Sequence, residues 1–325
     1  MTSTHKNIHI NEPINQTSLY GYEKYFSGFK KLIDENRLPK CIIFSGQKGS
    51  GKATFCYHLI NYILSTNEDK KYSLDKYSIN SNNKSYNLTI NNTHPNLFLI
   101  DNNLNDKQIK IEQIHNLITF TSKTTYKNDI KVVLIDNVEY LNKNSSNALL
   151  KVLEEPNKNT FFFLVHNSSS KILNTIKSRC IEYKIFFNNN EKKKIIEQLF
   201  GQYINKELPV SKLVNTYYFD SPGSILKYFL DLDTNDLDIF DSKYSSITYF
   251  IEKYMNDKSL ETLSFISLFI EHFYNEMCMK NLSNMYIYFF NKNKILEKLN
   301  NMKKFNLDEK NVFIEIKDIL AKDAK

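Results

Sequence analysis

The chain has 325 residues, of which 41% are hydrophobic, so it is long enough for two or three domains that each bury a core. Its four scattered cysteines form no C-x-x-C pair, no apolar run reaches membrane-spanning length, and residues 1–16 are polar. These features predict a cytoplasmic protein with no zinc ribbon, signal peptide or membrane partner. The net charge of +7 is compatible with nucleic acid or an acidic partner, and also with a solvated lysine-rich surface.

Five short runs of β-branched or aromatic residues alternate with helical patterns in the first half of the chain. Nearly continuous apolar runs, such as residues 132–135, are typical of strands buried on both faces of a parallel sheet. Apolar residues at helical spacing predict helices over 52–64 and 145–155. This alternation predicts an α/β domain with a five-stranded parallel sheet. The expected strands are 41–44, 97–100, 132–135, 161–165 and 181–185.

The strand signals fade after residue 188. Residues 66–93 are rich in Asn, Lys and Ser and predict a long surface insertion. In the last helix, Asn306 is expected to cap and Glu309 to bond back. We expect an α/β domain over 1–186, a small helical domain over 187–236 and a helical bundle over 237–325. The helices expected in the last two regions are 191–200, 224–230, 247–255, 260–277 and 285–299.

A phosphate-binding loop is predicted where the first strand meets the helix at 52–64. The segment 46–53 reads GQKGSGKA, whose glycines let backbone N–H groups curl around phosphate oxygens while Lys52 reaches the outer phosphates. The residue after Lys52 should offer a hydroxyl to Mg²⁺ but is Ala53, and Thr54 lies about 100° further round the helix. Whether ATP or ADP with Mg²⁺ occupies the loop stays open. The candidate nucleotide-binding residues here are Gly46, Gly49, Ser50, Gly51, Lys52, Ala53 and Thr54.

A carboxylate that could organise Mg²⁺ follows the third strand. Asp136 stands at the end of the run 132–135, where such a carboxylate belongs. Hydrolytic sites of this class commonly place a Glu next, but Asn137 cannot act as a base. Glu139 either reaches the site or is a solvated carboxylate that begins the next loop. Together with Ala53, these departures predict a chain that does not hydrolyse ATP efficiently by itself.

Arginine is rare in this chain: Arg37 and Arg179 are the only two, although Lys and Arg together number 43. Arginine differs from lysine because its planar, permanently charged fork can grip phosphate oxygens with two hydrogen bonds. Arg179 lies in the tripeptide Ser178-Arg179-Cys180, after the strand at 161–165. Arg37 is either a second functional arginine, near an adenine or a subunit interface, or a surface partner of Asp34 or Glu35.

The segments 147–156 (NALLKVLEEP), 162–165 (FFLV) and 175–180 (TIKSRC) resemble the AAA+ clamp-loader subunits of bacterial DNA polymerase III. Residues 36–39 and 305–308 resemble the delta-prime type in particular. The resemblance implies an AAA+ nucleotide-binding domain, a small α-helical lid and an α-helical collar that oligomerises. It also implies a place in a heteropentamer of gamma/tau-type and delta-type subunits that loads the sliding clamp on primed DNA.

The resemblance also implies roles for single residues. Arg179 would be an arginine finger that acts in trans, in the ATP site of the neighbouring subunit, with Ser178 and Cys180 holding its short helix. Asn167 would contact a γ-phosphate or the attacking water, whereas His166 is as well explained as a packing residue. The four-cysteine zinc module common in this family is absent, so no zinc or other metal site is expected.

Three functions follow from these features. A delta-prime-type subunit without autonomous ATPase activity explains the defects at Ala53 and Asn137, and the turn at 221–224 also lacks the nucleotide-sensing arginine of the family's motor subunits. The alternative is an ATP-hydrolysing gamma/tau-type motor subunit, in which Thr54 and Glu139 supply the missing groups. A free-standing nucleic-acid-binding protein is the third possibility, and it would bind DNA with a steep salt dependence.

Overall fold

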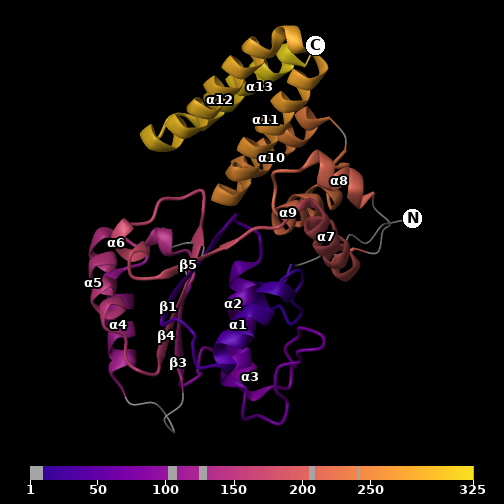
Figure 1. The fold of residues 1–325 in the computed structure, drawn as a ribbon. Helices are drawn as coiled ribbons and strands as arrows, with labels where there is room; N and C mark the ends of the chain where they lie inside the picture. The colour runs from indigo at the N-terminus through magenta and orange to yellow at the C-terminus, as the bar shows by residue number, and fades with distance from the viewer. Residues whose placement is uncertain (1–9, 102–107, 124–129, 205–208, 241, 325) are drawn as a thin grey trace. The chain divides into compact units, whose positions relative to one another are not determined.

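The computed structural model describes residues 10–101, 108–123, 130–204, 209–240 and 242–324 (Figure 1). The chain divides into two compact units, one that ends at Leu226 and one that begins at Lys227. Helix α9 (Pro222–Asp233) runs through this boundary. The expected division at residues 186 and 236 into three regions stays a prediction, because two units do not test it.

The first unit is built on a five-stranded, all-parallel sheet with the order β2-β3-β4-β1-β5. The sequence-based prediction of an α/β domain with this sheet is confirmed. Since β1 lies between β4 and β5, the loops that follow β1 and β4 leave the sheet side by side. The strands are β1 (Cys41–Gly46), β2 (Leu97–Ile100), β3 (Lys131–Ile135), β4 (Thr160–Asn167) and β5 (Ile181–Ile185).

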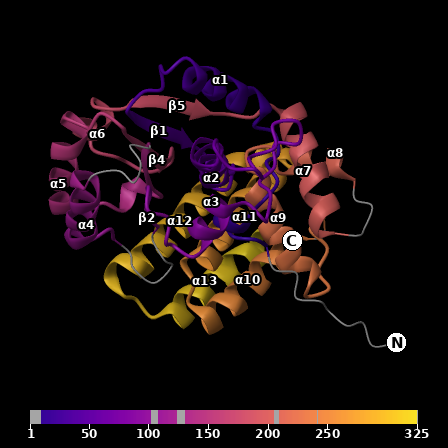
Figure 2. The same ribbon diagram turned by 90° about the horizontal axis from the view of Figure 1, so that it is seen from below.

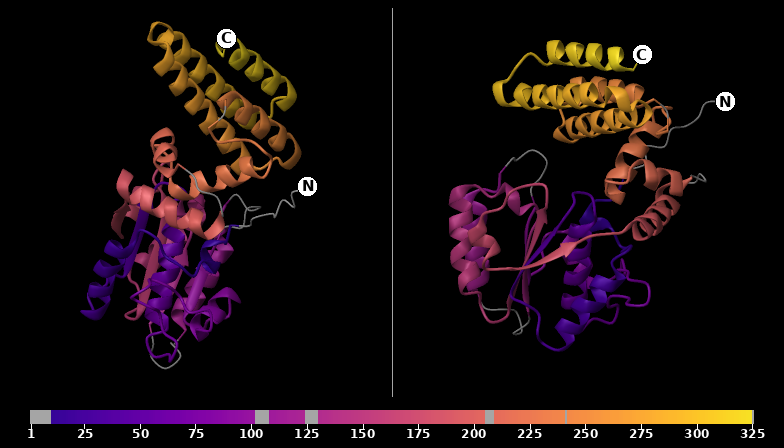
Figure 3. Two further views of the ribbon diagram at one scale, coloured as in Figure 1. Left: turned by 90° about the vertical axis from the view of Figure 1, so that its right-hand side faces the viewer. Right: turned by 45° about the horizontal axis from the view of Figure 1, so that its top comes forward.

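Helices cover both faces of this sheet (Figures 2 and 3). Successive side chains of a strand point to opposite faces, so Ile42 and Phe44 enter one core while Cys41 and Ile43 enter the other. All six residues of β1 are buried, which explains its continuous apolar pattern. One layer holds α1 (Glu23–Asp34), α2 (Lys52–Leu64) and α3 (Lys84–Ile90), and the other holds α4 (Ile111–Ser122), α5 (Lys143–Glu154) and α6 (Asn174–Lys177).

The Asn-rich segment 66–93 lies on the outside of the first layer with most of its residues exposed or half-buried, and a few buried residues anchor it. The Tyr72 ring stacks on Phe26 with ring centroids 4.9 Å apart, and its hydroxyl lies 2.9 Å from Nδ1 of the buried His58. Asn83 caps α3 and accepts a hydrogen bond from Asn61 at 3.0 Å. A few aromatic side chains and a buried amide network hold this segment, and neither leaves a periodic pattern in the sequence.

The remaining helices carry the chain from the first unit into the second. Each helix expected there from the apolar spacing is present, and α8 is an additional one. No helix in the described ranges is long and apolar enough to cross a bilayer. The helices are α7 (Asn189–Tyr203), α8 (Val210–Thr216) and α9, then α10 (Lys243–Asp257), α11 (Leu260–Lys280), α12 (Met285–Phe305) and α13 (Glu309–Asp323).

The expected cap of the last helix is corrected by the structure. Asp308, rather than Asn306, is the N-cap of α13, and its side chain accepts the Asn311 N–H at 2.8 Å. Asn306 instead ends α12 in the left-handed region, with φ of 48°. Glu309 does not bond back to the cap but pairs with Lys258 and accepts from the Tyr254 hydroxyl at 3.1 Å.

Substitutions at these two positions should therefore change stability in opposite directions. Asp308→Ala should lower the free energy of unfolding by about 1 kcal/mol, because it removes a helix cap. Asn306→Gly should raise it by roughly 0.4–1 kcal/mol, because glycine adopts a left-handed backbone without strain. Urea denaturation followed by circular dichroism measures both changes. A loss of stability in Asn306→Gly would instead support Asn306 as the N-cap.

Candidate functional site

The predicted phosphate loop joins β1 to α2 and has the backbone shape that such a loop requires. Gly49 and Gly51 adopt φ of 78° and 91°, a region that other residues rarely occupy. Lys52 begins α2 and is buried, and its ammonium donates to the carbonyls of Gly46 at 2.9 Å and Gln47 at 2.7 Å. Desolvation lowers the pKa of Lys52 to about 8, although the nearby charges of Asp136 and Glu139 oppose the shift.

The turn at the start of α9, which we call the lid turn (residues 219–224), lies directly on this loop. The Gly223 N–H donates to the Gly49 carbonyl at 3.0 Å, and the Gln47 side chain donates to the Phe219 carbonyl at 2.6 Å. A Cβ at Gly49 would clash with Ser221 Oγ and lie 2.7 Å from Ser224 Oγ. The lid turn thus occupies the Gly49 carbonyl, and a cavity of about 590 Å³ beside it is lined by Gly46, Gln47 and Ser50 of the loop and by Ser221 of the lid turn.

The groups that would hold a Mg-nucleotide are incomplete. Ala53 offers no hydroxyl, and Thr54, the next residue of α2, is rotated by about 100° around the helix. Ser50 Oγ, in contrast, is buried without a hydrogen-bond partner, so it could donate to a phosphate oxygen. The loop thus has the backbone and cation of a phosphate site but does not fit Mg²⁺ coordination in the usual way.

The acidic side of the site lies at the end of β3. Asp136 Oδ1 accepts the Asn137 N–H at 2.9 Å. Burial raises the pKa of Asp136 to about 7, and the charge of Asp101 adds to the shift, while Asn137 and Lys52 oppose it. Glu139 is half-buried, and its Oε2 accepts the Asn167 N–H at 3.3 Å. Glu139 is therefore held against β4 rather than free in a solvated loop.

The end of β4 brings Asn167 beside the phosphate loop. In the β1–β4 register, Asn167 is the partner of Gly46. Its side-chain oxygen accepts from the Ser169 hydroxyl at 2.9 Å. His166 is buried, and its Nε2 lies 3.1 Å from the Ser170 carbonyl, as expected of a packing residue at a strand end. The structure thus gathers the loop, Asp136, Glu139 and Asn167 at the carboxyl ends of the strands.

Arg179 does not join this group, because it lies at the opposite end of the sheet, near the amino ends of β5 and β1. It precedes β5, whose first residue Ile181 pairs with Ile42 near the start of β1. The phosphate loop leaves β1 at Gly46, four residues later, which is roughly 13 Å at the ~3.3 Å rise of a parallel strand. Arg179 and the chain's own phosphate loop therefore belong to different sites.

The Arg179 guanidinium is tied to α5 and α6. Its Nε donates to Glu154 Oε1 at 2.9 Å, and its Nη2 also contacts that oxygen. Its Nη1 donates to the Thr175 carbonyl at 2.9 Å and more weakly to Ser178 Oγ at 3.5 Å. Sequence reasoning missed Glu154, although it stands in the LEEP segment of the same family motif. The motif could have drawn attention to Glu154, but it does not indicate that this residue pairs with Arg179.

The other arginine, Arg37, pairs with Glu35 on the surface, which is one of its two expected roles. Arg37 Nη1 lies 3.4 Å from Glu35 Oε2, and the Arg37 side chain is largely exposed. An exposed pair of this kind contributes little to stability. In the described ranges, no group of three His, Cys, Asp or Glu side chains is placed to hold a metal ion. The expected absence of zinc stays a prediction.

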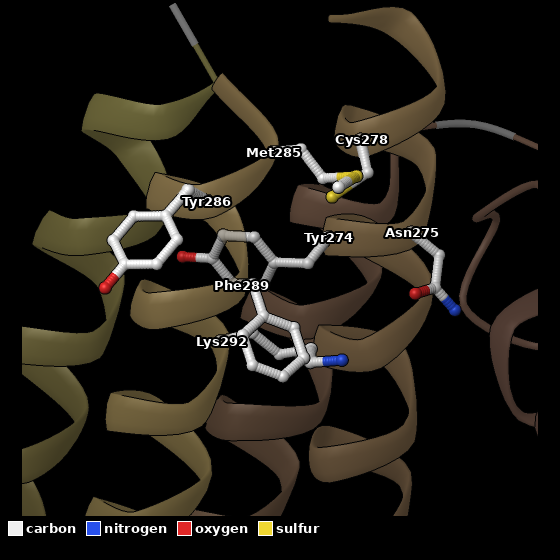
Figure 4. Close-up of a pocket in the computed structure, with 7 residues that line it drawn as sticks. All are labelled: Tyr274, Asn275, Cys278, Met285, Tyr286, Phe289 and Lys292. Carbon is white, nitrogen blue, oxygen red and sulfur yellow. The ribbon is translucent and has the colours of Figure 1, made fainter. Parts of the chain in front are cut away.

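The second unit carries a different candidate site, an apolar surface where α11 ends and α12 begins. A cavity of about 320 Å³ lies there. Figure 4 shows the side chains that line it, among them the Tyr274 and Phe289 rings and Met285. Patches of large exposed apolar residues commonly mark protein interfaces. This α11–α12 face comprises Met279, Leu282, Met285, Tyr286, Ile287, Phe289 and Phe290, each more than half exposed.

The chain is similar to known proteins over part of its length. The family model described as DNA polymerase III, delta subunit, matches residues 21–189, just over half of the chain. The DNA polymerase III subunit delta' of Pseudomonas aeruginosa is 40% identical over 90 residues, which cover 28% of this chain and 27% of that protein. The subunit delta' of Buchnera aphidicola subsp. Schizaphis graminum is 28% identical over 196 residues, 56% of this chain and 58% of that protein.

The matches thus span between about a quarter and three fifths of the length of these curated relatives. Among solved structures, a DNA polymerase III gamma subunit-related protein from Thermotoga maritima covers 92% of this chain and 99% of its own, with a TM-score of 0.47 and 16% identity.

The raised pKa of Asp136 predicts a pH-dependent effect of Asp136→Asn. Between about pH 4 and pH 7 the unfolded carboxyl ionises while the folded one keeps its proton, so Asp136 costs stability that increases with pH. The variant should therefore gain roughly 1–3 kcal/mol at pH 8, and the gain should shrink as the pH approaches 4. Urea denaturation across this pH range measures it, with Asp69→Asn at an exposed site as the control. A gain that does not vary with pH would contradict the shift.

Proposed function

The chain belongs to the delta-prime clamp-loader family of DNA polymerase III, and on that basis we propose that it donates Arg179 to the ATP site of a neighbouring loader subunit. In this role it is a delta-prime-type subunit of a heteropentamer that loads the sliding clamp on primed DNA. The observation that carries the proposal is the separation of Arg179 from the chain's own phosphate loop by most of the length of β1.

The chemistry of a guanidinium supports this role. Phosphoryl transfer spreads negative charge over the oxygens of the γ-phosphate, and a fixed cation stabilises that charge most where water is excluded. The Arg179 side chain is 30% exposed at the end of α6, so it is accessible to a neighbouring subunit. Lysine would bring the charge without the planar set of donors, which is consistent with an arginine at this position in a chain that has only one other.

We propose that the chain does not hydrolyse ATP efficiently at its own phosphate loop. Ala53 leaves Mg²⁺ without its usual hydroxyl, and Asn137 cannot accept a proton from water. The lid turn is bonded to Gly49 through Gly223 and holds the loop in its present position. ATP or ADP, with or without Mg²⁺, would enter beside the lid turn, through the cavity lined by Gly46, Gln47 and Ser50.

One observation favours the alternative of a gamma/tau-type motor subunit. Glu139 is held beside Asn167, at the carboxyl ends of the strands where the phosphate loop lies. Its charge opposes the lowering of the Lys52 pKa. A carboxylate there could polarise a water molecule if Thr54 or another group held Mg²⁺. Lone-chain ATPase activity distinguishes the two functions, since the motor requires it and the delta-prime type does not.

The α11–α12 face is proposed to be the surface that packs on a neighbouring loader subunit of the gamma/tau or delta type. It is apolar, aromatic and exposed in the isolated chain, as interface cores are. The cavity beside Tyr286 and Phe289 would accept an apolar side chain of the partner's own helical domain. The sliding clamp and primed DNA would meet this chain only through the assembled complex.

Substitution of Arg179 tests the finger directly. In a loader reconstituted with the native partner subunits, Arg179→Lys should lower the clamp-stimulated ATPase rate at least tenfold, because an ammonium lacks the planar set of donors that both holds the guanidinium in place and reaches the phosphate. Assembly, measured by gel filtration, should be unchanged. The matched control is Arg37→Lys, which alters the other arginine and should leave both readouts as in the wild type. A wild-type ATPase rate in Arg179→Lys would refute the proposal.

The isolated chain should show no ATPase activity above background, with or without primed DNA. A phosphate-release assay at saturating Mg-ATP measures it, and Lys52→Ala provides the baseline, since this change removes the cation of the phosphate loop. Turnover by the wild-type chain that Lys52→Ala abolishes would instead establish the motor function.

A further inference from the structure

The Arg179 guanidinium has five N–H groups, and the chain itself engages four of them. The Nε–H and one N–H of Nη2 are directed to Glu154 Oε1, and the two of Nη1 are directed to the Thr175 carbonyl and Ser178 Oγ. One N–H of Nη2 has no such partner within this group of contacts. The side chain is therefore held in one orientation, with a single donor left for another acceptor.

Both ends of the Arg179–Glu154 pair are anchored in the core of the first unit. Glu154 is the last residue of α5, and the adjacent Leu153 is buried and accepts a weak hydrogen bond from the Cys41 thiol at 3.8 Å. The Arg179 N–H donates to the carbonyl of the buried Ile176 at 3.1 Å. Because neither anchor can shift without disturbing the core, the Arg179–Glu154 pair has a fixed position near the amino end of β1.

The pair is expected to contribute little to stability. The Glu154 side chain is 49% exposed and that of Arg179 30% exposed, and exposed ion pairs contribute little to stability. What the pair does supply is orientation, because a free arginine side chain would lose considerable conformational entropy on reaching a phosphate. Groups whose rotamers are fixed before the reaction stabilise charge at no further cost.

We propose that Glu154 is a positioning residue that fixes the guanidinium of Arg179, so that the remaining N–H of Nη2 meets a phosphate oxygen of the neighbouring subunit's nucleotide. This inference rests on the proposed function, since it needs Arg179 to act in trans. It also differs from the opposite role, in which Glu154 holds Arg179 back and must release it. A two-bond grip on phosphate through Nε and Nη2 would require that release, whereas single-donor contact does not.

The two roles predict opposite effects of Glu154→Ala. If Glu154 positions Arg179, the reconstituted loader should lose roughly tenfold in kcat for ATP hydrolysis with little change in KM, because orientation is lost while nucleotide binding is not. Glu154→Gln keeps a side-chain oxygen as acceptor and should recover most of the rate. The matched controls are Glu155→Ala and Glu155→Gln, which change the adjacent, exposed carboxylate and should match the wild type.

A double-mutant cycle shows whether Glu154 acts through Arg179. Glu154→Ala should cause no further loss in a loader that already carries Arg179→Ala. An equal loss in both backgrounds would overturn the inference, and so would a wild-type or higher kcat in Glu154→Ala alone while Arg179→Ala is impaired. If Arg179→Ala itself keeps the wild-type rate, the proposed function fails instead. Thermal unfolding of the isolated Glu154→Ala chain should match the wild type, which excludes a general folding defect.

Discussion

Burial of β1 on both faces of the sheet is the constraint on which the two candidate sites of the first unit depend. All six residues of the strand are buried, and its side chains alternate between two separate cores. A strand packed on both faces cannot slide by one residue without exchanging those cores. β1 therefore fixes the distance between the phosphate loop at its end and the Arg179–Glu154 pair near its start.

This arrangement places the phosphate loop and Arg179 near opposite ends of β1. The phosphate loop keeps its glycines and lysine, its Gly49 carbonyl is bonded to the lid turn, and the lysine donates to loop carbonyls. The arginine, in contrast, is accessible and held in one orientation. In the proposed loader, the domain acts as a rigid holder that presents a cation to a neighbour. The α11–α12 face would bring that neighbour into place.

Buried polar groups form contacts that the sequence did not indicate. Residues 66–93 have the composition of a surface loop, yet Asn83 and His58 form hydrogen bonds in the interior that hold the segment in place. Glu139 was expected either in the site or in solvent, and its contact with the Asn167 N–H depends on how a short turn after β3 meets β4. Polar residues that are buried through specific partners carry no periodic signal, because their partners are distant in the sequence.

The strands, the phosphate loop and the helix that follows it could be predicted from the sequence, because apolar period, glycine spacing and the position of Lys52 are local properties of the chain. Family motifs also pointed to Arg179. The sequence could not give its partner, since Glu154 lies 25 residues earlier and the two meet only when α5 and α6 pack beside β1. The contact of Gly223 with Gly49 has the same origin. Tertiary packing decided both contacts, because pairing between distant residues depends on strand register and helix placement, which no local pattern encodes.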